Sequence, residues 1–287
     1  MKKLLTIIVL FLSVSAYAQA QKGVLFRMRI MPNHHYDILV KINMNMIMDV
    51  SGDSAAVRKL KNEGQKFPMI MNMENNVGMD IKTAMPNAQN RIPAVTNIRI
   101  QDIKMTVNGQ TTPLPNILKS QVMYGSYSPV GTTFVLDSLA GKKLGDTLTQ
   151  KMQKTFENYQ SKIQFPNTPM KVGDTFTQDL PLNIPLISTP SDVKAKTIYT
   201  LRSIEGNKAF FDTKNNLDMA LNLQGISMTV VGDGNGKMVY DITSNYATSI
   251  TMNMNLNYTM NMPQSEGTKM NGRMKMEMGL QTTIIPN

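Results

Sequence analysis

The chain has 287 residues, a formal net charge of +10, no cysteine and only 6% aromatic residues, none of them tryptophan. Without cysteine there are no disulfides, thiolate metal sites or cysteine nucleophiles. The positive charge is spread along the chain without the aromatic side chains that stack on nucleic-acid bases, so no nucleic-acid partner is expected, and peripheral contact with an anionic membrane surface is the alternative use of this charge.

The first residues predict export. Met1, Lys2 and Lys3 form a basic start, residues 4–12 are apolar, and Ala16-Tyr17-Ala18 has the small-x-small pattern of a cleavage site. The apolar run is shorter than the roughly 20 residues that span a bilayer. We therefore predict a signal peptide at residues 1–18, with cleavage after residue 20 as an alternative. The predicted location is the periplasm, with the extracellular space or the outer membrane as alternatives.

Alternation of apolar and polar residues predicts long antiparallel strands. Residues 36–50 carry Tyr, Ile, Val or Met at every even position and mostly polar residues between them, and residues 250–262 and 270–284 repeat this pattern. Such strands are typical of an antiparallel sheet that faces water on one side. Glycine-containing segments predict hairpin turns at 108–109, 205–207, 232–236 and 265–267. The turn at 232–236 would separate strands at 227–231 and 237–242.

Two segments have helical spacing instead. A short helix is expected from Asp53 or Ser54 to about Gly64, and a longer amphipathic helix over about 146–163. The predicted fold is mainly β: a long, curved, half-barrel-like antiparallel sheet with both helices packed on it. We expect a single β-rich domain at 19–287, with strand blocks at about 22–136 and 171–285 joined by the longer helix. A Pro-rich loop or covering flap is expected at 183–191.

Methionine is the most unusual feature of the composition, with 26 residues against nine phenylalanines. Burying a Met side chain gains about 1.5–3 kcal/mol but costs up to about 2 kcal/mol in rotamer entropy, so Leu or Ile would serve a rigid core better. Met suits an apolar surface that has to remain deformable. The residues predicted to line a ligand-binding concavity are Met44, Met46, Met48, Met252, Met254, Met274, Met276 and Met278.

Two other interpretations of the methionines stay open. One is an ordinary core in which Met serves as filler. The other is coordination of Cu(I), because soft thioether sulfur selects this ion and Met-x-Met recurs in residues 44–48, 69–73 and 274–278. Since most of these positions are needed for the core, we predict no metal site and no other cofactor.

Catalytic patterns are missing from the sequence. The two histidines, His34 and His35, are adjacent, so on a strand they would point to opposite sides and form a poor metal chelate. No Gly-x-Ser-x-Gly segment accompanies them. The glycines of 232–236 do not open a helix, as those of a phosphate loop do. We therefore predict that the protein is not an enzyme and has no catalytic residues.

One segment resembles a known motif. Pro169-Met170-Lys171-Val172-Gly173-Asp174-Thr175-Phe176 resembles the Pro-x-x-Val-Gly-Asp-Thr-aromatic motif of an uncharacterised family of exported bacterial β-rich proteins, and the hairpins that follow to about residue 262 are similar to theirs. The whole layout also resembles the lipoprotein-carrier fold of the LolA, LolB and LppX type, in which helices close the apolar concavity of a curved sheet. This second resemblance implies a periplasmic carrier of acyl chains.

The function that these patterns favour is a non-enzymatic periplasmic protein that binds a hydrophobic or lipid-like ligand in a Met-lined concavity. The first alternative is a structural β protein of the outer membrane or cell surface, because alternating strands suit that role as well. The second alternative is a Met-rich Cu(I)-binding protein. A hydrophobic small molecule or lipid is the expected partner, and the sequence defines no oligomeric state.

Overall fold

The computed structural model describes residues 23–52, 54–62, 66–112, 121–140, 163–180, 193–223, 226–261 and 268–287. These residues form twelve strands and one α-helix, α2 (Ser54–Asn62). The strands are β1 (His34–Gly52), β2 (Met69–Thr83), β3 (Ile92–Val107), β4 (Gln110–Thr112), β5 (Gln121–Tyr127), β6 (Phe134–Leu139), β7 (Thr175–Leu180), β8 (Val193–Glu205), β9 (Lys208–Leu223), β10 (Ile226–Asp241), β11 (Tyr246–Asn261) and β12 (Thr268–Pro286).

All twelve strands belong to one antiparallel sheet, in the order β6-β5-β3-β2-β1-β12-β11-β10-β9-β8-β7, with β4 paired to β3. The strands thus form two meanders, β1 to β6 and β7 to β12, which meet where β1 pairs with β12. This central pair runs from His34 opposite Pro286 to Gly52 opposite Thr268. The sheet is open, with β6 at one edge and β7 at the other. The predicted mainly β fold with a large antiparallel sheet is confirmed.

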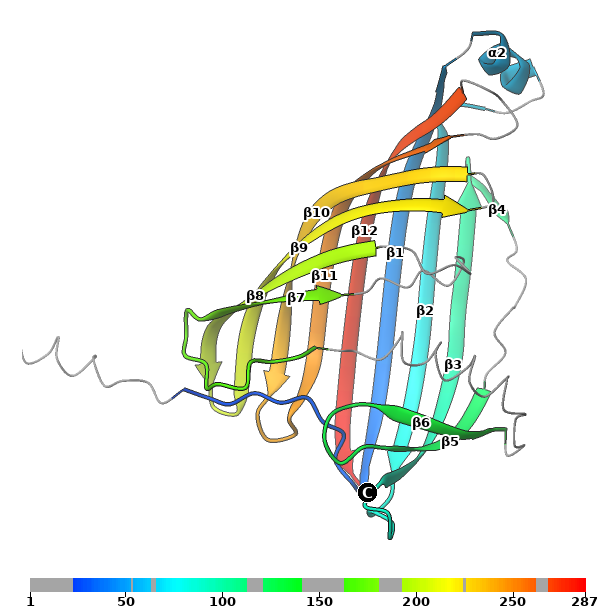
Figure 1. Ribbon diagram of the computed structural model, residues 1–287. Coiled ribbons are helices and arrows are strands. Elements are labelled where there is room, and N and C mark those ends of the chain that lie inside the picture. Colours follow the sequence, from blue (N-terminus) through cyan, green and yellow to red (C-terminus); the bar gives the residue numbers. More distant parts are fainter. Residues whose placement is uncertain are drawn as a thin grey trace, which may run out of the picture.

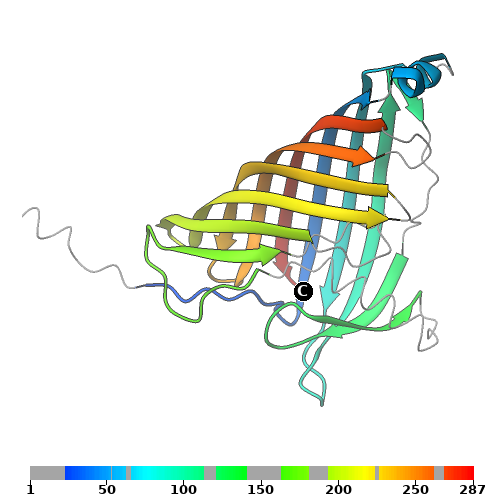
Figure 2. The same cartoon turned by 45° about the horizontal axis from the view of Figure 1, so that its top comes forward.

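The sheet bends back over itself. In Figure 1, β1, β2, β3 and β12 run side by side as long strands, whereas β8, β9 and β10 bend and cross in front of them, and Figure 2 shows the same crossing. One apolar cluster joins the two layers, since it contains Met48 of β1 together with Leu217 of β9 and Val230 of β10. The apolar sides of β1, β2 and β8 to β12 therefore face an interior between the long strands and the crossing strands.

The interior is aromatic at one end and methionine-rich at the other. At the aromatic end, the ring of Phe26 lies 5.2–5.4 Å from those of Phe165, Phe211 and Tyr240. A second cluster packs around Tyr36, at the beginning of β1. The third cluster contains the Met48 end of β1 and is built largely of thioethers. Tight aromatic packing thus holds one end of the sheet, and a softer apolar surface occupies the rest.

The prediction of a hairpin turn at 232–236 is wrong. β10 continues through these residues, and Gly232, Gly234 and Gly236 all lie on its inner side. A Cβ atom at Gly234 would lie 2.1 Å from the backbone oxygen of Asn253 on β11, and the other two glycines have equally close neighbours. The glycines are therefore required by the close approach of β10 to β11 and not by a turn.

The helix predictions have different outcomes. The short helix is present as α2, but it lies beyond the end of β1 and not across the sheet, so its predicted packing is wrong (Figure 1). The longer helix predicted at 146–163 lies outside the described residues except for Ile163, which is buried in the aromatic cluster and is not helical. The predicted signal peptide and the Pro-rich segment 183–191 also lie outside the described residues. No helix among the described residues is long and apolar enough to cross a membrane.

The other local predictions agree with the structure where it describes them. The alternating segments are strands β1, β11 and β12. Asn108 and Gly109, both with positive φ, connect β3 to β4, and Gly206, also with positive φ, lies in the β8–β9 turn. These turns need residues that tolerate the left-handed region, which is why the Asn-Gly signal was informative. The turn predicted at 265–267 lies outside the described residues.

Candidate functional site: the methionine face

The inner sides of β1, β2, β11 and β12 share one run of methionines, which we call the methionine face. All eight methionines predicted to line the ligand site belong to it, because even-numbered residues of β1, β11 and β12 point to the same side of the sheet. The methionine face consists of Met44, Met46, Met48, Met69, Met71, Met73, Met252, Met254, Met260, Met270, Met274, Met276 and Met278.

Strand register aligns these methionines into rows across the sheet. Met44 of β1 is opposite Met73 of β2 on one side and Met276 of β12 on the other. The row continues to Met105 of β3 and to Met254 of β11. Because neighbouring strands lie about 4.8 Å apart, five methionines in line form a continuous thioether strip nearly 20 Å long. The alternation in each strand could be read from the sequence, but the alignment between strands could not.

The methionine face is partly buried. Met48 and Met254 are 7% and 3% exposed and pack in the cluster that joins the two layers. The other six predicted ligand-binding methionines are half-buried. Along β1, the side chains of Tyr36 and Ile38 at one end and Met48 and Val50 at the other are buried, whereas those between them are half-buried. Apart from Met48 and Met254, all methionines of the methionine face are therefore partly accessible.

The inner side of the sheet carries no charge in the part of the chain described. Lys, Arg, Asp and Glu on β1, β2 and β8–β12 occupy the alternate positions, on the outer side, or a bulge. On the outer side they form ion pairs, such as Arg99 with Asp37 at 2.7 Å and Lys275 with Glu277 at 2.8 Å. A charged group placed on the methionine face would have no counter-ion there, so this surface suits an uncharged, apolar ligand.

The crossing strands contribute residues that the sequence prediction missed. Met219 of β9 and Met228 of β10 belong to the same cluster as the methionine face. Three polar residues, Thr197, Thr213 and Asn215, are buried on the inner side of β8 and β9. Alternation at 209–219 was the available signal, but Thr and Asn on the inner side made that segment resemble an exposed strand.

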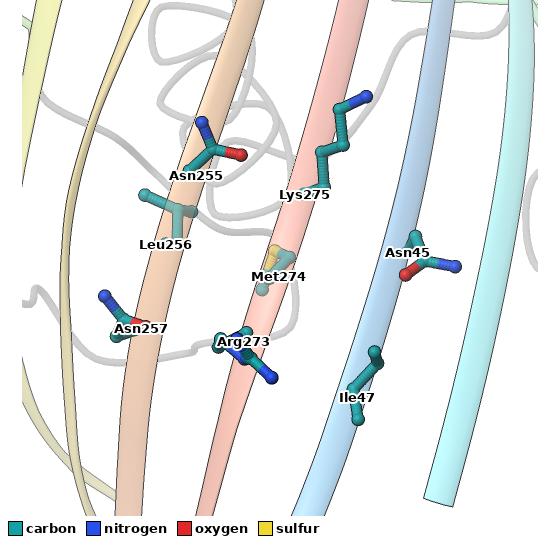
Figure 3. Close-up of a pocket in the computed structure, with 8 residues that line it drawn as sticks. All are labelled: Asn45, Ile47, Asn255, Leu256, Asn257, Arg273, Met274 and Lys275. Carbon is teal, nitrogen blue, oxygen red and sulfur yellow. The ribbon is translucent and has the colours of Figure 1, made fainter.

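Two hollows lie mainly outside the methionine face, and only Met274 of the face lines one of them. The first, of about 190 Å³, lies where β1, β12 and β11 meet and is lined mostly by outer-side residues together with Leu256 and Met274. Figure 3 shows Arg273 and Lys275 of β12 between the asparagines of β1 and β11 in this hollow. The second, of about 490 Å³, lies between the end of β1 and α2 and includes Gly52 and Val57. The methionine face is thus a packed, partly exposed surface, and neither hollow is the Met-lined concavity expected from the sequence.

Tyr258 interrupts the methionine face near one end, one inner-side position before Met260. Its ring lies over Gly272 of β12, where a Cβ atom would be 2.4 Å from the Tyr258 hydroxyl oxygen. The side chain is 6% exposed, and its hydroxyl has no hydrogen-bond partner among the described residues. Burial raises the pKa of Tyr258 above the ordinary value for tyrosine. The phenol thus stays neutral and adds no charge to the inner side.

The contacts of the two histidines and of the Val-Gly-Asp-Thr motif are those of structural residues. His35 contacts Asp80 of β2 at 2.6 Å, and the ring of His34 contacts the carbonyl oxygen of Pro32 at 2.7 Å. In the motif, the backbone N–H of Lys171 donates to the Asp174 carboxylate at 2.7 Å and Gly173 has positive φ. The motif is therefore a turn that leads into β7. The described residues contain no cluster of three or more His, Cys, Asp or Glu side chains that could hold a metal ion.

Comparison with known proteins gives only distant structural similarity. No family model matches the chain, and no curated protein matches it. A lipovitellin structure, described as showing lipid–protein interactions, is similar with a TM-score of 0.45 and 11% identity, over 90% of this chain and 26% of that one. A pilotin–secretin AspS–GspD complex of ETEC has a TM-score of 0.18 and 8% identity, over 98% of this chain and 53% of that one. The chain spans about a quarter and about half of the lengths of these two.

Proposed function

We propose that this protein binds a hydrophobic or lipid-like molecule on its methionine face, without catalysing a reaction, after export to the periplasm. The observation that carries the proposal is the uncharged row of thioethers that register aligns across β3, β2, β1, β12 and β11, half-buried except for Met254. The proposal places an acyl chain or a similar apolar group along this row, between the long strands and the crossing strands.

Methionine explains how a packed surface can take a ligand. Its unbranched side chain has three rotatable bonds, so it can change rotamer to make room for an irregular apolar molecule at little cost. Most methionines of the face, including Met44 and Met276, are half-buried and so have room for such movement. The ligand would therefore enter by displacing thioethers and not by filling a preformed cavity.

The first test is the content of the purified protein. The chain should be purified from the periplasmic fraction without detergent, examined by native mass spectrometry, and extracted for lipid analysis. We expect bound lipid and saturable binding of a fluorescent fatty-acid probe. A protein that repeatedly emerges empty and binds no acyl probe contradicts the proposal. Recovery only in detergent-solubilised outer membrane would favour the alternative of a structural outer-membrane protein.

A matched pair of variants localises the binding. Met44→Gln places a polar amide of similar shape at the centre of the methionine face, whereas Asn43→Gln changes the adjacent, exposed residue on the outer side. Desolvating the amide without a partner costs about 1–3 kcal/mol, so Met44→Gln should weaken probe binding about tenfold. Asn43→Gln should leave it unchanged. Equal affinities in the two variants would move the binding site away from the methionine face.

The row of sulfur atoms also keeps Cu(I) binding as a second candidate, because thioethers of adjacent strands lie within reach of one ion. Changing Met274, Met276 and Met278 together to Leu separates the two functions. A lipid-binding protein still binds the acyl probe in this variant, since Leu is also apolar and of similar volume and the other methionines of the face remain. A Cu(I)-binding protein loses its copper affinity while remaining folded.

A further inference from the structure

A polar spot interrupts the apolar interior. On the inner side of β8 and β9, Thr197, Thr213 and Asn215 are 4%, 6% and 6% exposed. They lie between the apolar cluster of the methionine face, which includes Leu217, and the aromatic cluster, which includes Phe211. Three adjoining buried polar side chains in an otherwise apolar, uncharged interior require hydrogen-bond partners.

Asn215 has an unused donor. The hydroxyl of Thr197 donates to its Oδ1 at 2.9 Å, which fixes the amide with Nδ2 directed away from that bond. Nδ2 has no hydrogen-bond partner among the described residues. On β10 the residue opposite Asn215 is Gly234, which has no side chain, and Met254 packs over that glycine. The amide N–H groups thus adjoin a bare stretch of backbone and a thioether.

Register places this donor at the level of the methionine row. Asn215 is opposite Gly234, Gly234 is opposite Met254, and Met254 is opposite Met276. An acyl chain lying along the row would have its end, or a carbonyl within it, at the amide of Asn215. The three polar side chains are therefore where the head of an amphiphilic ligand would be recognised.

The surroundings of Asn215 disfavour a charged ligand head group. Nδ2 is a hydrogen-bond donor and can donate either to a carboxylate oxygen or to a neutral carbonyl oxygen. An ionised carboxylate, however, would be taken out of water with no Lys or Arg on the described inner side to compensate it. A carbonyl oxygen of an ester gains the same hydrogen bond without that desolvation penalty.

We propose, as a refinement that rests on the proposed function, that the ligand is a neutral acyl ester whose carbonyl oxygen accepts a hydrogen bond from Nδ2 of Asn215 while its chain lies on the methionine face. Thr197 is a positioning residue, because its hydroxyl holds the amide in the donating orientation.

The test compares three probes of equal chain length: methyl palmitate, ionised palmitate and hexadecane. The wild-type chain should bind methyl palmitate at least about tenfold more tightly than palmitate. In Asn215→Leu, the affinity for methyl palmitate should fall about tenfold, while the affinity for hexadecane stays unchanged. The control, Asn216→Leu, alters the next residue on the exposed outer side of β9 and should behave as wild type.

The outcomes are distinct. Failure of the wild-type chain to bind any of the three probes overturns the proposed function itself. Binding of acyl chains without preference for the ester, or with the same preference in Asn215→Leu, overturns only the role of Asn215. If Asn215→Leu does not fold, the wild-type probe series still decides the ester preference. Thr197→Val, which removes one hydroxyl, should then reduce that preference without abolishing binding of hexadecane.

Discussion

The close approach of β11 to β10 requires glycine at position 234, and Gly234→Ala tests this. The added Cβ atom would lie 2.1 Å from the backbone oxygen of Asn253 and 2.9 Å from the Cα atom of Met254, whereas ordinary contact begins at 3.4 Å. Because backbone atoms cannot rotate away, β10 and β11 must separate by about 1 Å. Overpacking costs about 1–3 kcal/mol, and weakening one or two ladder hydrogen bonds adds about 1 kcal/mol each.

We expect the free energy of unfolding to fall by about 2–5 kcal/mol in Gly234→Ala, with a decrease in melting temperature on the order of 10 °C. The matched control is Gly279→Ala in β12, where a Cβ atom would meet nothing within 4 Å. This change should leave stability unchanged or raise it by up to about 1 kcal/mol, because Ala is less flexible than Gly in the unfolded chain. Denaturant titration followed by circular dichroism measures both. Equal stabilities would refute the idea that close approach requires glycine at 234.

Three further predictions concern buried hydroxyls. The Thr282 hydroxyl is buried without a hydrogen-bond partner among the described residues. Thr282→Val should therefore raise the free energy of unfolding by about 1 kcal/mol, as measured by denaturant titration. An unchanged free energy would mean that the hydroxyl does have a hydrogen-bond partner. The Tyr240 hydroxyl donates to the carbonyl of Arg27 and accepts from the Arg27 backbone N–H at 3.2 Å. Tyr240→Phe should therefore lower the free energy of unfolding by about 1–2 kcal/mol and speed proteolysis near Arg27. Unaltered cleavage would argue against a stabilising role of these two hydrogen bonds. Burial raises the pKa of Tyr199 and of Tyr240 to about 12, from 10.0, by disfavouring the phenolate. The free energy of unfolding should therefore be unaffected by these tyrosines below pH 10 and should fall between pH 10 and 12. The absorbance of tyrosinate should rise together with unfolding. Ionisation of Tyr199 and Tyr240 near pH 10 in a chain that stays folded would contradict this prediction.

Local chemistry made most of the strands predictable. Strict alternation in β1, β11 and β12 reflects one apolar and one wet side, which a sequence displays directly. The turn prediction at Gly232–Gly236 was wrong because glycine is used both in turns and where two strands approach closely. Only the distance to Asn253 on a neighbouring strand distinguishes the two, and that distance is a long-range property.

The candidate site was predictable in kind but not in extent. The methionines of β1, β11 and β12 could be assigned to one side of a sheet, but their partners could not, because register between distant strands is not written in either strand alone. The crossing of β8–β10 was not foreseen either. It brings Asn215 and Met219 to the interior although their segment alternates less clearly than β1.

The pairing of β1 with β12 has a consequence for how the protein acquires its structure. Gly52 is paired with Thr268 and His34 with Pro286, so the middle seam of the sheet joins segments more than two hundred residues apart in the chain. Contacts of such high sequence separation form slowly, because a long loop has to close before any stabilising energy is gained. Until that happens, both meanders present an unpaired hydrogen-bonding edge and a bare thioether surface, which favours intermolecular association. A folding helper that shields the exposed edge of β1 would therefore act at the step that commits the molecule to its final architecture.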